Sequence, residues 1–115
     1  MRAGNELDQA QVLEVVIQTL DILQAIHSVG YTYNDLKPDN IMMNNDKHRK
    51  LRLTLTDFGL ASKYNCEDKQ EVFLGNYLFA SLNQLEFKVA QPKDDLISLC
   101  YMMFYLLNGC DLPEF

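Results

Sequence analysis

Apolar residues recur at helical spacing in residues 8–28. The stripe consists of Leu13, Val16, Leu20, Leu23 and Ile26, widened by Val12, Ile17 and Ile22. A repeat of three and four residues predicts an amphipathic helix that buries this stripe. Asp8 and Gln11 have the spacing of a capping box, and Gly30 suits the end of a helix. We expect His27 to pack in a partly buried position rather than to bind a metal, because the sequence offers it no partner ligands.

A two-residue alternation replaces this pattern in residues 41–56. Residues 41–43 and 51–56 read as short strands, and the second alternates leucine with arginine or threonine at each position. The polar run at 44–50 is expected to be a solvated turn, which we favour over a charged binding patch. The pattern therefore predicts a β-hairpin.

Residues 92–108 predict a second long helix. Asp94 and Asp95 open it, where carboxylates suit the positive end of a helix. From Leu96 to Leu107 only one serine and two tyrosine hydroxyls are polar. This run of 12 residues is too short to cross a bilayer. We expect a buried central helix, and an α+β, mainly α fold with two long helices and a short hairpin.

The composition narrows the class of protein. Of the 115 residues 48% are hydrophobic, which suits a globular core, and the net charge is −6. This acidity argues against a nucleic-acid or anionic-membrane partner. The three cysteines are an odd number without a C-x-x-C pair, which indicates reduced thiols: Cys66, Cys100 and Cys110. The N-terminal residues are too polar for a signal peptide, so we expect a cytoplasmic or nuclear protein.

Two short stretches carry the candidate chemistry. The first reads YTYNDLKPDN (residues 31–40) and the second reads LTDFG (residues 55–59). They contribute four polar side chains: Asp35, Lys37, Asn40 and Asp57. A carboxylate can orient the proton of an attacking hydroxyl, and carboxylate and amide oxygens are the hard ligands that magnesium prefers. Such a set suits phosphoryl transfer, in which the protein positions groups and neutralises charge. Two unrelated turns that happen to contain Asp and Asn are the alternative.

The same stretches resemble the protein-kinase catalytic loop, H-R-D-L-x-x-x-N, and the metal-binding turn, D-F-G. From about residue 7 to residue 113 the chain resembles the casein kinase 1 family, with the vaccinia-related kinases next. IHSVGYTYNDLKPDNIMM is similar to the region of its catalytic loop, LGNYLFAS to its G-T-A-R-Y-A-S segment, and KDDLISLCYMMFYLLNGCDLP to its D-D-L-E-S-L-G-Y helix. The resemblance implies a serine/threonine kinase with a protein substrate and with ATP and Mg²⁺ as cofactors.

The resemblance also implies a role for each matching residue. Asp35 would orient the substrate hydroxyl, and Lys37 would neutralise the transferring phosphoryl group. Asn40 and Asp57 would bind the metal and the nucleotide, on a turn set by Phe58 and Gly59. Asp95 would anchor the backbone of the catalytic loop instead of only capping its own helix. The substrate-facing loop would contain Gly75, Asn76 and Ser81.

The resemblance covers only part of a kinase domain. No G-x-G-x-x-G loop and no V-A-I-K strand occur in the 115 residues. We therefore expect a fragment of the C-terminal lobe. Its parts would be a helix before the catalytic loop (7–30), the catalytic loop, hairpin and D-F-G (31–59), the activation and substrate-binding segment (60–92) and the central helix (93–109).

The chain departs from the family pattern at several positions. Tyr33 and Asn34 replace His and Arg; the arginine would dock a phosphate, so we expect activity without phosphorylation of the activation segment. Asn76 replaces a threonine that braces the catalytic aspartate and lysine. Leu78 replaces an arginine of an anion-binding patch, which weakens the expectation of acidic substrates. A kinase-like binding module without phosphotransfer therefore stays open, as does a truncated gene product with an exposed apolar surface on residues 96–107.

Overall fold

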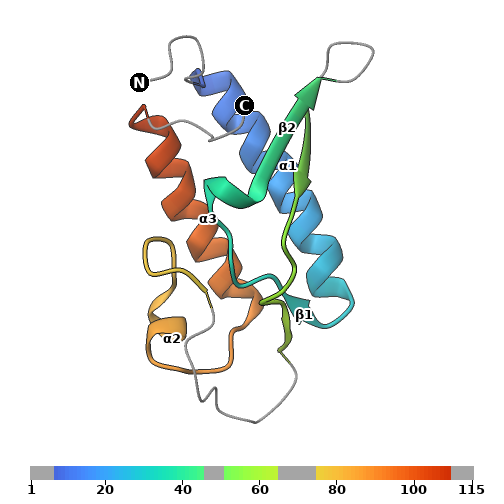
Figure 1. The fold of residues 1–115 in the computed structure, drawn as a ribbon, viewed down its shortest axis with the longest axis vertical. Coiled ribbons are helices and arrows are strands. Elements are labelled where there is room, and N and C mark those ends of the chain that lie inside the picture. The colour runs from blue at the N-terminus through green and yellow to red at the C-terminus, as the bar shows by residue number, and fades with distance from the viewer. Residues whose placement is uncertain (1–6, 46–50, 65–74, 110–115) are drawn as a thin grey trace.

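The computed structural model describes residues 7–45, 51–64 and 75–109. Two long helices, α1 (Gln9–Ser28) and α3 (Pro92–Leu107), lie side by side, and the remaining elements of the described residues are short (Figure 1). These are β1 (Tyr31–Thr32), a 3₁₀ turn (Pro38–Asn40), β2 (Ile41–Asn45), β3 (Leu51–Leu55), β4 (Ser62–Lys63) and α2 (Leu82–Leu85). Helix with a small sheet agrees with the predicted α+β, mainly α class. Cys66, Cys110 and residues 65–73 of the predicted activation segment lie outside the described residues.

The predicted caps of α1 are present. The Asp8 carboxylate accepts a hydrogen bond from the Gln11 N–H (2.8 Å), and the Gln11 side chain accepts one from the Asp8 N–H (3.0 Å). Beyond the helix, Gly30 has a φ of +89°, a conformation that favours glycine. Residues near each end therefore fix where this helix begins and ends.

The buried face of α1 differs from the predicted stripe. Three residues of that stripe are 42 to 57% exposed: Leu13, Ile17 and Leu20. The buried face consists of Val12, Val15, Thr19 and Leu23. Thr19 is accommodated because its hydroxyl donates to the Val15 carbonyl oxygen (2.7 Å). The prediction is confirmed for Val12 and Leu23, and three more residues of the stripe pack partly buried against the core: Val16, Ile22 and Ile26. It was wrong for Leu13, Ile17 and Leu20 because α1 carries apolar side chains over a wide arc, and periodicity does not decide which part of that arc meets the core.

Strands β2 and β3 form the predicted hairpin. They are antiparallel, with Ile41 opposite Leu55. Leu53 and Leu55 are buried whereas Arg52 and Thr54 are exposed, as the alternation predicted. In this register the residue before Ile41 and the residue after Leu55 lie at the base of the hairpin. The candidate site lies there.

Two further contacts position this base. The Gln18 side chain of α1 donates to the Leu51 carbonyl oxygen (2.8 Å) and accepts from the Leu53 N–H (2.7 Å). Strands β1 and β4 pair antiparallel, with Thr32 opposite Ser62. That pairing, too short for the sequence to predict, brings the segment after D-F-G beside the start of the catalytic loop.

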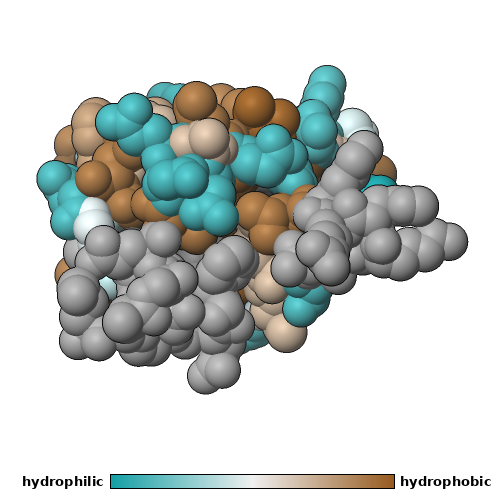
Figure 2. All heavy atoms as spheres, turned by 90° about the horizontal axis from the view of Figure 1, so that it is seen from above, coloured by the Kyte–Doolittle hydropathy of each residue, from teal (hydrophilic) through white to brown (hydrophobic). Residues whose placement is uncertain are grey.

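Helix α3 is buried on one face only. Its buried residues are Asp94, Asp95, Ser98, Leu99, Met102 and Leu106. Five large apolar side chains are 39 to 59% exposed: Leu96, Tyr101, Phe104, Tyr105 and Leu107. The expected burial of this helix is therefore confirmed for one face only within the described residues. Figure 2 shows hydrophobic surface, in brown, between polar side chains. Neither long helix within the described ranges combines the length and hydropathy needed to span a membrane.

Candidate functional site

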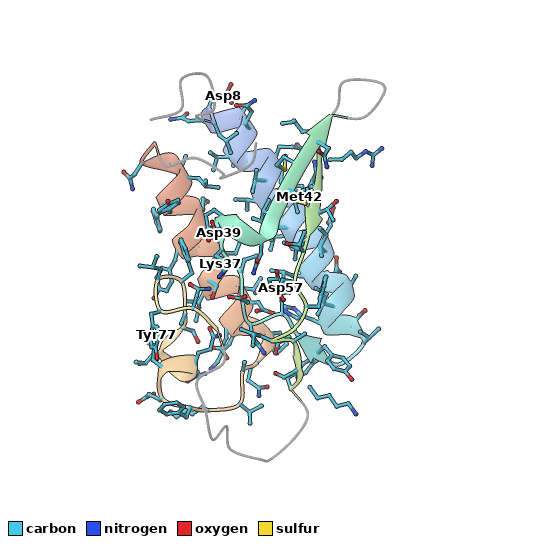
Figure 3. The ribbon with its side chains drawn as sticks, viewed as in Figure 1. Asp8, Lys37, Asp39, Met42, Asp57 and Tyr77 are labelled. Atoms are coloured by element: carbon cyan, nitrogen blue, oxygen red, sulfur yellow. The ribbon has the colours of Figure 1, made fainter. Side chains whose placement is uncertain are left out.

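The predicted site residues meet beside the base of the hairpin. The Asn40 side chain donates to the Asp35 backbone oxygen (2.8 Å) and to the Asp35 carboxylate (3.0 Å). The Lys37 ammonium lies 3.9 Å from the other carboxylate oxygen of Asp35. Lys37 and Asp57, both labelled in Figure 3, come from the two loops that flank the hairpin. The structure therefore brings the first motif together as one polar cluster.

Asp35 is buried and held from both sides. Its Oδ2 accepts from Asn40, and its Oδ1 accepts from the Asn76 side chain (3.2 Å). Asn76 is itself fixed, because its Oδ1 accepts a hydrogen bond from the Phe79 N–H (2.8 Å). The amide at position 76 thus contacts the aspartate that the family's threonine would brace. Such a carboxylate has a defined orientation, which a general base requires.

The second motif is joined to the first through the backbone. The Thr56 N–H donates to the Asn40 carbonyl oxygen (2.9 Å), so Asn40 and Asp57 lie at the two ends of the hairpin base. Asp57 has a φ of +56°, and its carboxylate accepts from the Gly59 N–H (3.1 Å). A Cβ at position 59 would lie 3.1 Å from the Asp57 carboxylate, so glycine leaves room for this orientation.

The donor set at this base fits magnesium. Asp57 offers a carboxylate oxygen and Asn40 an amide oxygen. Mg²⁺ takes one or two such protein ligands and completes its octahedron with water and phosphate oxygens. The described residues hold no cluster of three or more His, Cys, Asp or Glu that would bind a metal by themselves. A metal at this site would take its remaining ligands from water or phosphate oxygens.

Tyr33 connects the two motifs. It is fully buried, and its hydroxyl donates to the Thr56 carbonyl oxygen, next to Asp57. Burial, and then the charge of Asp35, raise the pKa of Tyr33 above its usual range, so the hydroxyl stays a neutral donor. The Tyr33 and Phe58 rings meet edge to face with centroids 5.3 Å apart. Apart from a tyrosine where the family has histidine, no pattern in the sequence indicates this bridge.

Asp95 holds the backbone at the start of the catalytic loop. Its carboxylate accepts from the Tyr33 N–H (2.8 Å) and the Asn34 N–H (2.9 Å). It also contacts His27 Nε2 at 2.7 Å, as expected if that nitrogen carries the proton. Asp95 thus contacts the backbone of two residues at the start of this loop as well as lying in the first turn of its own helix, and its anchoring role stays a prediction. His27 has a specific polar partner, which the sequence did not indicate.

Asn34 binds the segment that follows D-F-G. Its side-chain N–H groups donate to the Leu60 carbonyl oxygen (2.8 Å) and the Ser62 hydroxyl (2.7 Å). Its φ is +74°, which asparagine tolerates better than most residues. From the sequence alone, Asn34 indicated only the loss of a charge. The structure gives it a direct contact that needs no phosphate.

The predicted substrate loop lies next to these groups. Asn76 reaches Asp35, as described, and Gly75 has a φ of +140°. Ser81 is different, because its side chain is buried and accepts from the Gln84 N–H (3.3 Å) as the cap of α2. Its hydroxyl therefore faces the protein interior rather than the open side of the loop.

Comparison with known proteins finds matches among protein kinases. The protein kinase domain family matches residues 1–114. Casein kinase 1-like protein HD16 of Oryza sativa subsp. japonica is 27% identical over 92% of this chain and 16% of its own length. The probable serine/threonine-protein kinase pknA2 of Bifidobacterium longum is 31% identical over 95% of this chain and 14% of its own length. B1 kinase of Monkeypox virus is 31% identical over 92% of this chain and 37% of its own length.

The chain thus spans between 14% and 37% of the length of these relatives. The relatives come from several groups of kinases, so the similarity does not single out the casein kinase 1 type. The match extends over the whole described site, including both motifs. This chain belongs to the protein kinase family.

Proposed function

We propose that this chain is the catalytic-loop part of a serine/threonine protein kinase, within the C-terminal lobe. The observation that carries the proposal is the cluster at the hairpin base. There Asn40 and Lys37 contact Asp35, and Asn40 is joined by its backbone to the residue before Asp57. The finer assignment to the casein kinase 1 type is supported by the KPDN and DDL segments and by the similarity to HD16.

The roles follow from the contacts. Asp35 accepts the proton of a substrate serine or threonine hydroxyl, because two amides hold its carboxylate in one orientation. Lys37 neutralises charge on the transferring group, and its presence in the catalytic loop favours serine/threonine over tyrosine acceptors. Asn40 and Asp57 would hold Mg²⁺, which supplies charge neutralisation for phosphoryl transfer from bound ATP.

A second candidate function is a kinase-like binding module. The 115 residues contain no Gly-rich phosphate loop and no strand lysine, which are the parts that cradle a nucleotide. We therefore expect the 115-residue chain alone to show no phosphotransfer. A clear magnesium-dependent transfer by this chain alone would contradict that expectation.

The deciding experiment is Asp35→Asn in the full-length gene product that contains this chain. Phosphate transfer to a protein substrate should fall by on the order of 10²-fold or more, because the amide cannot accept the proton. Asp21→Asn, an exposed change on α1, is the matched control and should leave transfer unchanged. Transfer that survives Asp35→Asn would overturn the enzyme assignment. Full-length protein without any transfer would support the binding module.

A further inference from the structure

A groove of about 750 Å³ lies between α1 and β3. One wall consists of residues of α1 together with Asp8, which caps that helix, and the other wall consists of residues 51–53 of β3. Figure 3 labels Asp8 at the start of α1. None of the candidate catalytic residues lines this space, which we call the α1–β3 groove.

The Gln18 side chain covers the edge of β3 that faces α1. It donates to the Leu51 carbonyl oxygen and accepts from the Leu53 N–H, and its Nε2 also donates to the Glu14 carboxylate (2.8 Å). A ligand therefore cannot pair with this edge as an additional strand, because the backbone groups it would need are already bonded to Gln18. Recognition in the α1–β3 groove would use side chains instead.

Carboxylates lie on the α1 wall of the groove. Asp8 and Glu14 are both exposed. One oxygen of each carboxylate accepts a hydrogen bond from a residue of α1, which orients the group, and its exposure keeps it accessible to a donor from outside. Arg52, the cationic residue of the lining, belongs to the β3 wall. A bound segment would therefore turn its basic side chains toward α1, where charge-assisted hydrogen bonds can form.

The spacing of these carboxylates suits an extended chain. Asp8 and Glu14 are six residues apart, which corresponds to about 9 Å along a helix. A polyproline II segment has about three residues per turn and rises about 3.1 Å per residue, so its residues i and i+3 lie on one side about 9 Å apart. Its backbone needs no hydrogen-bond partner, which agrees with the covered edge of β3.

The lining also offers apolar contact. Ile22 and Leu51 line the α1–β3 groove, and both are half-buried and pack against the core. The supporting core keeps these two side chains in place, so a ligand would meet a preformed apolar surface beside the carboxylates. An apolar side chain of a bound segment could pack there.

We propose that the α1–β3 groove binds an extended basic segment of a partner protein. The segment carries basic side chains at positions i and i+3, which meet Asp8 and Glu14, and an apolar side chain between them, which packs on Leu51. The net charge of −6 attracts such a segment toward the protein. This inference goes beyond the proposed function, because the groove contains none of the candidate catalytic residues.

The test is binding of labelled proline-rich peptides to the full-length gene product that contains this chain, measured by fluorescence anisotropy. The spaced peptide has arginines at i and i+3 with a leucine between them. The adjacent peptide has the same composition with neighbouring arginines, and the acidic peptide has glutamates in their place. The spaced peptide should bind about fivefold more tightly than the adjacent peptide and about 20-fold more tightly than the acidic one, with a smaller advantage at high salt. Equal affinity for the spaced and adjacent peptides, or no binding of any peptide, would overturn the proposal.

Charge variants assign the effect to the groove. Glu14→Lys should weaken binding of the spaced peptide about tenfold, and the milder Glu14→Gln should weaken it about threefold. Glu86→Lys is the matched control, because Glu86 is exposed and lies outside the groove, and the substitution changes the net charge by the same amount as Glu14→Lys. Circular dichroism checks that each variant is folded. Equal losses of affinity in Glu14→Lys and Glu86→Lys would assign the effect to the overall charge and overturn the proposal.

Other outcomes identify a different occupant or separate this inference from the proposed function. A dimer that Glu14→Lys dissociates in sedimentation velocity, without any peptide binding, would assign the groove to a second copy and overturn the proposal. Binding of the spaced peptide by a protein without phosphate transfer would uphold the groove and reject the enzyme. Transfer that Asp35→Asn abolishes, together with equal affinity for the three peptides, would uphold the enzyme and reject the groove.

Discussion

Removing the Asp95 carboxylate should destabilise the protein far more than removing its neighbour. Asp95→Ala deletes the acceptor of the Tyr33 and Asn34 N–H groups and the partner of His27. Both residues of the loop are buried, so water does not replace the lost acceptor. An unsatisfied buried donor costs about 1–3 kcal/mol, and breaking a buried charged contact costs about 3–5 kcal/mol. We expect the free energy of unfolding to fall by about 3–5 kcal/mol.

Asp94→Ala is the matched control. Asp94 lies in the same first turn of α3 and is equally buried, but its carboxylate accepts only from the Gln91 N–H (2.7 Å) among the described contacts. Loss of such a cap costs about 1 kcal/mol. Urea unfolding of both variants, followed by circular dichroism, gives the two differences on one scale.

The comparison distinguishes an anchor from a plain helix cap. Equal losses of about 1 kcal/mol in Asp94→Ala and Asp95→Ala would refute the anchoring argument. If Asp95→Ala does not fold, the milder Asp95→Asn replaces it, and amide hydrogen exchange is measured at Tyr33 and Asn34. Those two amides should lose protection in Asp95→Asn and keep it in Asp94→Asn.

Two further predictions concern the residues that replace the family's histidine and arginine. Phosphatase treatment of the full-length protein should leave its phosphotransfer rate within about twofold, because Asn34 binds Leu60 and Ser62 without a phosphate; a rate that drops tenfold would contradict this. Tyr33→Phe should lower the free energy of unfolding by about 1 kcal/mol, because the Thr56 carbonyl oxygen loses its donor. Because the pKa of Tyr33 is raised in the folded protein, the stabilisation by its hydroxyl is present below pH 10 and is lost as the pH rises further. Urea unfolding at pH 9 and 11 should therefore show a larger fall in the free energy of unfolding for wild type than for Tyr33→Phe.

Local structure followed from signals a few residues apart. The capping pair Asp8 and Gln11 lies within one helical turn, and Gly30 adopts the conformation that its missing side chain permits. The leucine alternation in β3 predicted which side chains are buried. In each case the interacting groups belong to one short segment, so the sequence alone specifies the local structure.

The buried faces of the helices were not predictable in this way. Leu13 on α1 and Phe104 on α3 are exposed although they belong to apolar runs. Which part of a wide apolar arc is buried depends on the elements that pack there. The positions of the hairpin and of the partner helix determine which part is buried, and the periodicity within one helix does not encode those positions.

The sequence by itself determined the motif residues, because D-L-x-x-x-N and D-F-G are contiguous patterns. Tertiary structure alone decided how they are held: His27 meets Asp95 across 68 positions, and Asn34 meets Leu60 across 26. Contacts between distant segments depend on the path of the whole chain, which local propensity does not specify. Short stretches of sequence therefore specify which residues carry the chemistry of the site, whereas the packing of α1, α3 and the hairpin determines their geometry.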